Sequence, residues 1–140
     1  MLRALGILGP KPPGNREVLL AAIPVRNELV EESRTAKGEL RLKAPLRETM
    51  MKRLFGSQRR EKSFELDDLG EAVWGDIDGR KSVEGIIMHF AQTQRVNARE
   101  AEVSVTAFLK TLMQRNLIAL VASKKEATRL RQQERARKRR

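Results

Sequence analysis

The side chains best suited to catalysis are scarce in this chain of 140 residues. His89 is the only histidine, and cysteine is absent. A metal site needs several histidine, cysteine or carboxylate ligands that converge, and no such set accompanies His89 in the sequence. A serine–histidine–acid arrangement would call for a nucleophile motif, which is also missing. We therefore expect His89 to be exposed or peripheral, with no metal site and no cofactor.

The acidic residues Asp67, Asp68 and Glu71 form the second group with chemical potential. Two carboxylates can act as general acid and base, but acids at the start of a helix also stabilise its N-terminus, and this explanation is simpler. The glycines form neither a GxGxxG nor a Walker motif, so no phosphate-binding loop is expected. With four phenylalanines, one tryptophan and no tyrosine, a base-stacking platform is not expected either. These observations favour a binding protein over an enzyme.

The net charge of +11 is concentrated near the C-terminus. Residues 124–140 include nine lysines or arginines and two glutamates, a net charge of +7 that leaves +4 for residues 1–123. Such a tail favours nonspecific contact with polyanions such as RNA, DNA or an acidic lipid surface. A solubilising, partly helical extension explains it equally well.

The composition predicts one central domain with two flanking segments. We interpret residues 1–22 as a flexible extension with a short helix before Pro24, residues 23–121 as the domain, and residues 122–140 as the basic tail. The longest apolar run has eight residues, whereas a membrane span needs about 20. The expected location is therefore the cytoplasm.

The first half of the domain has the pattern of strands. Residues 23–34 are expected to be extended, and residues 35–38 to form a turn in which Gly38 takes a positive φ. Apolar and charged residues alternate over 39–44, which is typical of a half-buried strand. These elements predict a hairpin, and residues 62–66 are expected to form the third strand.

A basic insert, residues 45–62, separates the second and third predicted strands. Its apolar residues fall at helical spacing among several lysines and arginines, which is the pattern of an amphipathic segment. We expect it to pack on its own domain; docking on a lipid surface or a partner is the alternative.

Three helices are expected to follow. The first, residues 68–77, should bury Leu69, Val73 and Ile77 with Trp74 at the border, before a stop at Asp78-Gly79. The second begins after the cap Ser82, and the third extends from the cap Asn97 to about Arg115, with Asn116 in the left-handed conformation. Their predicted core positions are Val83, Ile86, Ile87 and Phe90, then Ala101, Val105, Phe108, Leu109 and Leu112. A short extended segment at 117–121 should close a winged-helix-like α+β domain, in which a small three-stranded antiparallel sheet precedes three helices.

Three short motifs follow one another along the chain: Leu-Asp-x-Leu-Gly from Leu66, Asp-Gly-x-x-Ser-Val from Asp78, and Phe-Leu-x-x-Leu from Phe108. The stretches 23–26 and 39–44 precede them where two further strands would lie. This ordered set resembles the PqqD-like family, the small peptide chaperones also called RiPP recognition elements. The resemblance covers roughly residues 23–121, and it supports the fold more directly than the function, because turns and caps have structural roles.

The resemblance implies a non-enzymatic mechanism. Members of this family bind the leader of a ribosomally made precursor peptide and present it to a modifying enzyme, often a radical-SAM enzyme. The leader adds as an antiparallel strand to the third strand and lies against the third helix, which is β-strand addition. Carried onto this chain, the peptide-binding residues would be Lys62, Ser63, Phe64, Glu65 and Leu66 on the strand, with Val103, Thr106, Ala107 and Lys110 on the helix. The extension, insert and tail depart from the compact family pattern, so the precursor peptide need not belong to quinone-cofactor synthesis.

Two alternatives belong to other functional classes. A winged-helix nucleic-acid-binding protein would insert the third helix into the major groove, but the first turns of that helix contain Glu100 and Glu102 beside Arg99. An RNA or membrane adaptor would use the domain only to position the basic tail. Neither alternative explains the ordered motifs.

Overall fold

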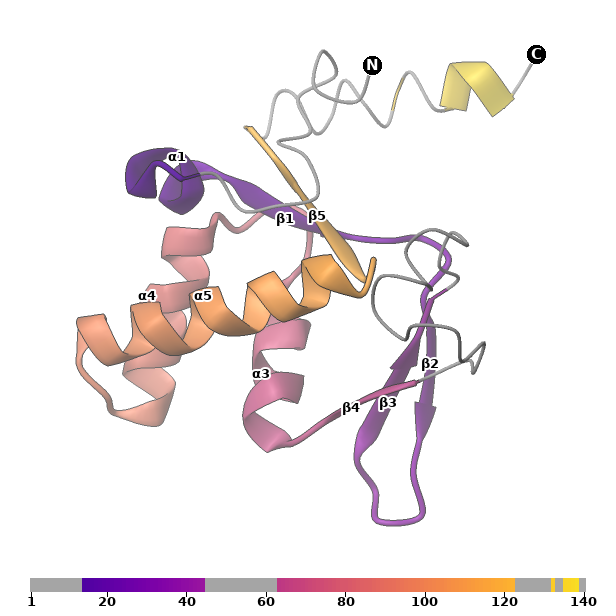
Figure 1. Ribbon diagram of the computed structural model, residues 1–140, viewed down its shortest axis with the longest axis horizontal. Coiled ribbons are helices and arrows are strands. Elements are labelled where there is room, and N and C mark those ends of the chain that lie inside the picture. Colours follow the sequence, from indigo (N-terminus) through magenta and orange to yellow (C-terminus); the bar gives the residue numbers. More distant parts are fainter. Residues whose placement is uncertain (1–13, 45–62, 123–131, 133–134, 139–140) are drawn as a thin grey trace.

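The computed structural model describes residues 14–44, 63–122, 132 and 135–138 (Figure 1). The elements follow in the order α1 (Arg16–Ala21), β1 (Ile23–Arg26), β2 (Glu31–Arg34), β3 (Leu40–Lys43), β4 (Phe64–Leu66), α3 (Asp68–Asp76), α4 (Val83–Gln94), α5 (Ala98–Gln114) and β5 (Ile118–Val121). A three-stranded antiparallel sheet is followed by three helices, so the predicted α+β class is confirmed. The predictions for the insert 45–62, including Lys62, lie outside the described residues.

The strands form two sheets. One has the order β2-β3-β4, and the other is a ribbon of β1 and β5. The prediction of one extended segment over 23–34 was wrong, because the chain turns at Asn27. The Asn27 N–H donates to the Leu117 carbonyl at 2.9 Å, and its side-chain amide donates to the Asn116 carbonyl at 2.9 Å. This anchor directs β1 onto β5, which leaves only Glu31–Arg34 to pair with β3.

The helices begin and end where local signals predicted. The Asp67 carboxylate accepts from the Gly70 N–H at 2.8 Å, the Ser82 hydroxyl from the Gly85 N–H at 3.1 Å, and the Asn97 side chain from the Glu100 N–H at 2.8 Å. Positive φ angles occur at both predicted positions, Gly38 and Asn116, and also at Gly79 and Arg95. Each cap satisfies a backbone N–H that a helix terminus would otherwise leave without a partner.

Two predictions for α3 were wrong. Leu69 is 46% exposed, whereas Trp74, placed at the border, is only 2% exposed. The burial of Trp74 is stabilised by two contacts across the molecule: its Nε1–H donates to Glu32 Oε1 at 2.6 Å, and the Arg26 guanidinium lies 4.3 Å from the ring centroid. A buried indole N–H needs such an acceptor. The N–H of Trp74 thus links α3 to β2, and its ring links α3 to β1.

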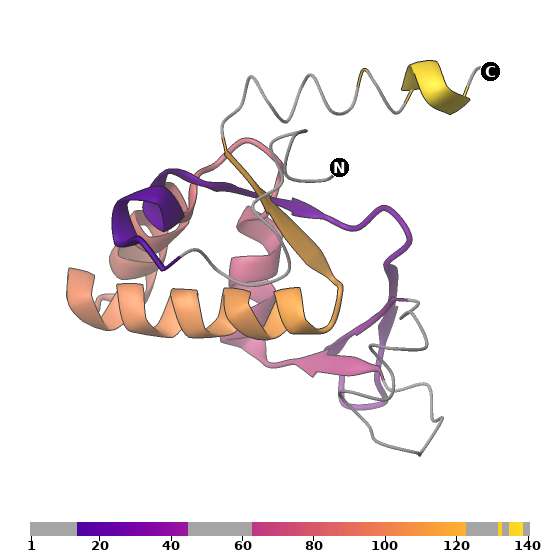
Figure 2. The same ribbon diagram turned by 45° about the horizontal axis from the view of Figure 1, so that its top comes forward.

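The main core lies between the helices and the inner face of the sheet, with α5 at its centre. Leu40, Leu42 and Leu66 of the sheet pack with apolar residues of α3, α4 and α5. Figure 2 shows α5 between the β1–β5 ribbon and β4. In the described part of the chain, no helix is long and apolar enough to cross a membrane.

Candidate peptide-binding edge

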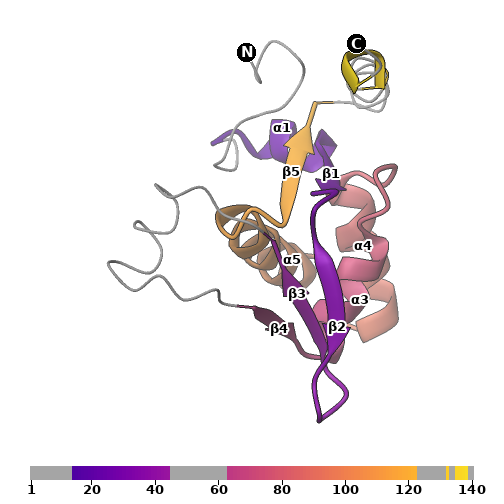
Figure 3. The same ribbon diagram turned by 90° about the vertical axis from the view of Figure 1, so that its right-hand side faces the viewer.

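β4 lies at one edge of its sheet. It pairs with β3 in the register Leu40↔Leu66, Arg41↔Glu65 and Leu42↔Phe64, and the strand order places no described strand on its other side (Figure 3). An edge strand offers backbone N–H and C=O groups to an added strand. The predicted third strand is therefore an edge within the described residues.

The side chains of β4 alternate between two faces. Leu66 is buried in the core and Phe64 packs against that core, whereas Glu65 lies on the opposite face. The Glu65 carboxylate accepts from Arg41 Nη2 on β3 at 3.2 Å. The face shared by Phe64 and Leu66 is thus the apolar face of this edge.

One flank of α5 lies against Phe64. The centroids of the Phe64 and Phe108 rings are 6.4 Å apart with the planes tilted by 31°, and the Arg115 guanidinium lies 4.8 Å from the Phe64 centroid. Phe108 and Arg115 are seven residues apart, so they share one side of the helix. We call the surface made by Phe64, Phe108 and Arg115 the β4–α5 face.

Phe108 also packs on α3. A Cβ on Gly70 would stand 3.3 Å from two atoms of the Phe108 ring and 3.3 Å from the Asp67 carboxylate. The absence of a side chain at Gly70 thus allows Phe108 of α5 to approach α3 closely. Phe108 was predicted as a core residue. It packs against the main core but is only partly buried, and its neighbours are Gly70 of α3 and Phe64 of β4.

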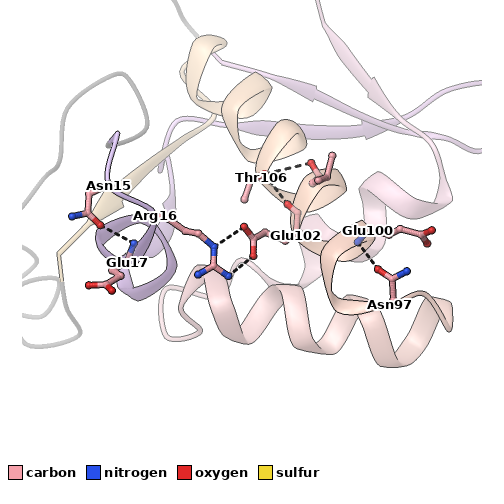
Figure 4. Close-up of polar contacts among 8 residues, drawn as sticks. Asn15, Arg16, Glu17, Asn97, Glu100, Glu102 and Thr106 are labelled. Carbon is pink, nitrogen blue, oxygen red and sulfur yellow. Dashed lines mark hydrogen bonds and ion pairs between the residues drawn. The ribbon is translucent and has the colours of Figure 1, made fainter.

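The structure distributes the four predicted residues of α5 around its outer side. Val103, Ala107 and Lys110 are exposed, and Thr106 is half-buried. The Thr106 hydroxyl donates to the backbone carbonyl of Glu102, one helical turn earlier, at 2.7 Å. The Glu102 side chain is the one that Arg16 of α1 contacts (Figure 4). By helical geometry, Ala107 is the member of this set nearest to the Phe108–Arg115 side, and Thr106 lies toward the other border.

Sequence reasoning missed Phe108 and Arg115 as members of this surface. Phe108 fitted the core stripe, and Arg115 looked like a helix terminus. The sequence signal that could have identified them is their spacing: an aromatic residue and an arginine seven residues apart lie on the same flank of a helix.

Ion pairs attach other elements around this surface. Arg16 donates to Glu102 through Nη2 at 2.7 Å and Nε at 2.9 Å, and the hydrogen bond and charge of Arg16 lower the pKa of Glu102. Arg34 of β2 likewise holds the pKa of Glu71 of α3 below its usual value, mainly through a side-chain hydrogen bond. These pairs are exposed to solvent, which screens their charges, so each contributes little to stability.

The described residues offer little for catalysis. His89 lies on the surface, as predicted, with Nδ1 at 2.6 Å from the Asp76 carboxylate. Across the part of the chain that the structure describes, no three histidine or carboxylate residues are grouped to hold a metal ion. Asp67, once considered as a catalytic acid, caps α3.

An open hollow of about 460 Å³ lies between β1 and the end of α3. Its one carboxylate, Asp78, accepts from the N–H groups of Arg80 and Lys81 at 2.8 and 2.9 Å, and these bonds lower its pKa. An acid already used by the backbone is a poor general base. The lining residues are Val25, Arg26, Gly75, Ile77, Asp78 and Gly79.

Comparison with known proteins gives one match. No curated protein and no solved structure matches the chain. Residues 57–118 match the family model of coenzyme PQQ synthesis protein D (PqqD). The matched stretch is less than half of the chain, but it contains β4, α3, α4 and α5, and so the whole β4–α5 face. Over residues 57–118 the chain is therefore similar to the PqqD family.

Proposed function

We propose that this protein binds the leader of a ribosomally made precursor peptide and presents it to a modifying enzyme. The observation that carries the proposal is the one-sided pairing of β4 next to α5. The leader adds to the outer edge of β4 as an antiparallel strand and contacts α5 with every second side chain. The family match supports this function because it covers both elements.

Main-chain pairing alone is too weak for useful affinity. β4 has three residues, and each backbone hydrogen bond contributes only about 0.5–1.5 kcal/mol net. Ordering a free peptide costs about 2–5 kcal/mol, whereas micromolar binding requires about −8 kcal/mol. Apolar peptide side chains must therefore supply the remainder.

Phe64 and Phe108 provide the apolar surface that these side chains need. The two rings pack against the main core and remain only partly buried. Ala107 is exposed, and among the four predicted helix residues its direction from the helix axis is nearest to that of Phe108. From the residues predicted on the helix, Ala107 is thus the strongest candidate, and Ser63 to Leu66 supply the strand.

The test is titration calorimetry with the leader of the short precursor peptide encoded nearest this gene. Ala107→Glu should weaken binding at least about tenfold, because a carboxylate would be placed against apolar peptide side chains. Gln92→Glu is the matched control, since Gln92 is an exposed position on α4, and it should bind as wild type does. Equal affinity of a folded Ala107→Glu variant would show that the peptide binds elsewhere.

A further inference from the structure

The described residues at the two ends of β4 differ in charge. At its start, the Arg115 guanidinium lies over the Phe64 ring at 4.8 Å. At its end, Asp67 and Asp68 follow Leu66 directly, and both are exposed. A strand added to this edge would therefore pass a cation at one end and two carboxylates at the other.

In the described residues, the charged groups of α5 that lie nearest to this edge are basic. Between Val103 and Arg115, the charged residues of α5 are Lys110 and Arg115, and both are basic. Glu65, the acid within β4, points to the opposite face and pairs there with Arg41. A guanidinium carries five N–H donors, so a further acceptor can be accommodated beside the ring that it covers.

We infer that this edge selects a peptide in which an acidic side chain follows an apolar one at even spacing. The inference rests on the proposed function and adds the chemistry of the peptide. In an antiparallel strand, the residue opposite Leu66 precedes the residue opposite Phe64. An apolar side chain at position i would lie near Phe108, and an acidic side chain at i+2 or i+4 would reach Arg115, because alternate residues share a face.

The acidic end of the edge reinforces the same direction. Asp67 and Asp68 lie where the N-terminal part of the antiparallel peptide would pass, so they disfavour acids there. A peptide in the opposite direction would bring its apolar and acidic residues to the wrong ends. The charges thus select the strand direction as well as the composition.

The experiment is selection from a phage-displayed library of random ten-residue peptides on the full chain. Wild type should enrich aspartate or glutamate at an even spacing on the C-terminal side of an apolar residue. The Arg115→Glu variant should enrich lysine or arginine at that position instead. Arg99→Glu is the control, because Arg99 is exposed in the first turn of α5, at the opposite end of the helix from Arg115, and this variant should retain the acidic preference.

A second measurement tests the same inference without relying on the Arg115→Glu variant being folded. A selected peptide and its acid-to-amide analogue are titrated against wild type and Arg115→Gln. The amide analogue should bind wild type about tenfold more weakly than the acidic peptide, as expected for the loss of a charge-assisted hydrogen bond. The two peptides should bind Arg115→Gln with equal affinity.

Three outcomes overturn specific claims. Selected peptides without an acidic preference, or with the acid before the apolar residue, would contradict the inference while leaving peptide binding intact. An acidic preference that survives in Arg115→Glu and Arg115→Gln would assign it to another group and also contradict the inference. A library that yields no binding peptide would contradict the proposed function itself.

Discussion

The Phe108 ring lies so close to Gly70 that a single methyl group on Gly70 would stand 3.3 Å from it. This contact fixes one side of Phe108, and Phe64 contacts the ring at a centroid distance of 6.4 Å. The position of the β4–α5 face therefore depends on a glycine in α3, which lies outside that face.

Gly70→Ala should separate stability from peptide binding. Alanine favours a helix interior by about 1 kcal/mol over glycine, but the new methyl group must push the half-buried Phe108 ring outward. We expect little net change in thermal stability and a several-fold loss of affinity for the leader peptide. Calorimetry on both properties checks this.

Gly75→Ala is the matched control for that substitution. Gly75 lies in the same helix, and a Cβ there would have nothing within 4 Å. It should stabilise the fold by up to about 1 kcal/mol and leave binding unchanged. If Gly70→Ala behaved identically, the contact with Phe108 would not constrain the binding surface.

The Arg16–Glu102 pair predicts a small dependence of stability on pH. Arg16 lowers the pKa of Glu102 from the ordinary value of 4.5. A lowered pKa in the folded state means that the stabilisation is present above the ordinary value and is lost as the pH falls through the lowered one. Glu102→Gln should therefore melt slightly below wild type at neutral pH, and the two melting curves should converge in acid.

Glu100→Gln provides the control, since it removes a carboxylate from the same turn of α5. A difference between wild type and Glu102→Gln that does not shrink as the pH falls below the ordinary carboxylate range would show that the ion pair is not its cause.

The domain should fold without its last 17 residues. The described residues of the tail, 132 and 135–138, are all exposed. Lys138 Nζ lies 3.4 Å from the Glu28 carboxylate, and the two side chains are 74% and 70% exposed. Such a pair contributes little. A chain that ends at Ser123 should lose less than about 8 °C in melting temperature, and a greater loss would mean that the tail stabilises the domain.

Local features of this fold could be predicted from the sequence because their causes are local. The caps at Ser82 and Asn97 and the left-handed Asn116 each depend on a few neighbouring residues. The pairing of β1 with β5 joins Ile23 to Val121 across most of the chain, and no short-range pattern encodes it. The burial of Trp74 was missed because its acceptor, Glu32, lies 42 residues away.

The same distinction explains the candidate site. The strand predicted at 62–66, observed as Phe64–Leu66, and the helix that accompanies it were predicted from alternation and periodicity. Helical periodicity separates the core side of α5 from its outer side, but it does not tell which flank faces β4. Phe108 and Arg115 acquire their place only when β4 is packed beside α5.

Amide hydrogen exchange at β4 tests the central claim most directly. The account predicts that saturation with the leader peptide slows exchange by at least about tenfold for those backbone amides of residues 63–66 that point to the open edge, because the added strand hydrogen-bonds to them. β2 is the internal control, since it forms the other edge of the same sheet with all four residues exposed, and its exchange should not change. Unchanged exchange at β4 in a saturated complex, or protection at β2 instead, would contradict strand addition at this edge.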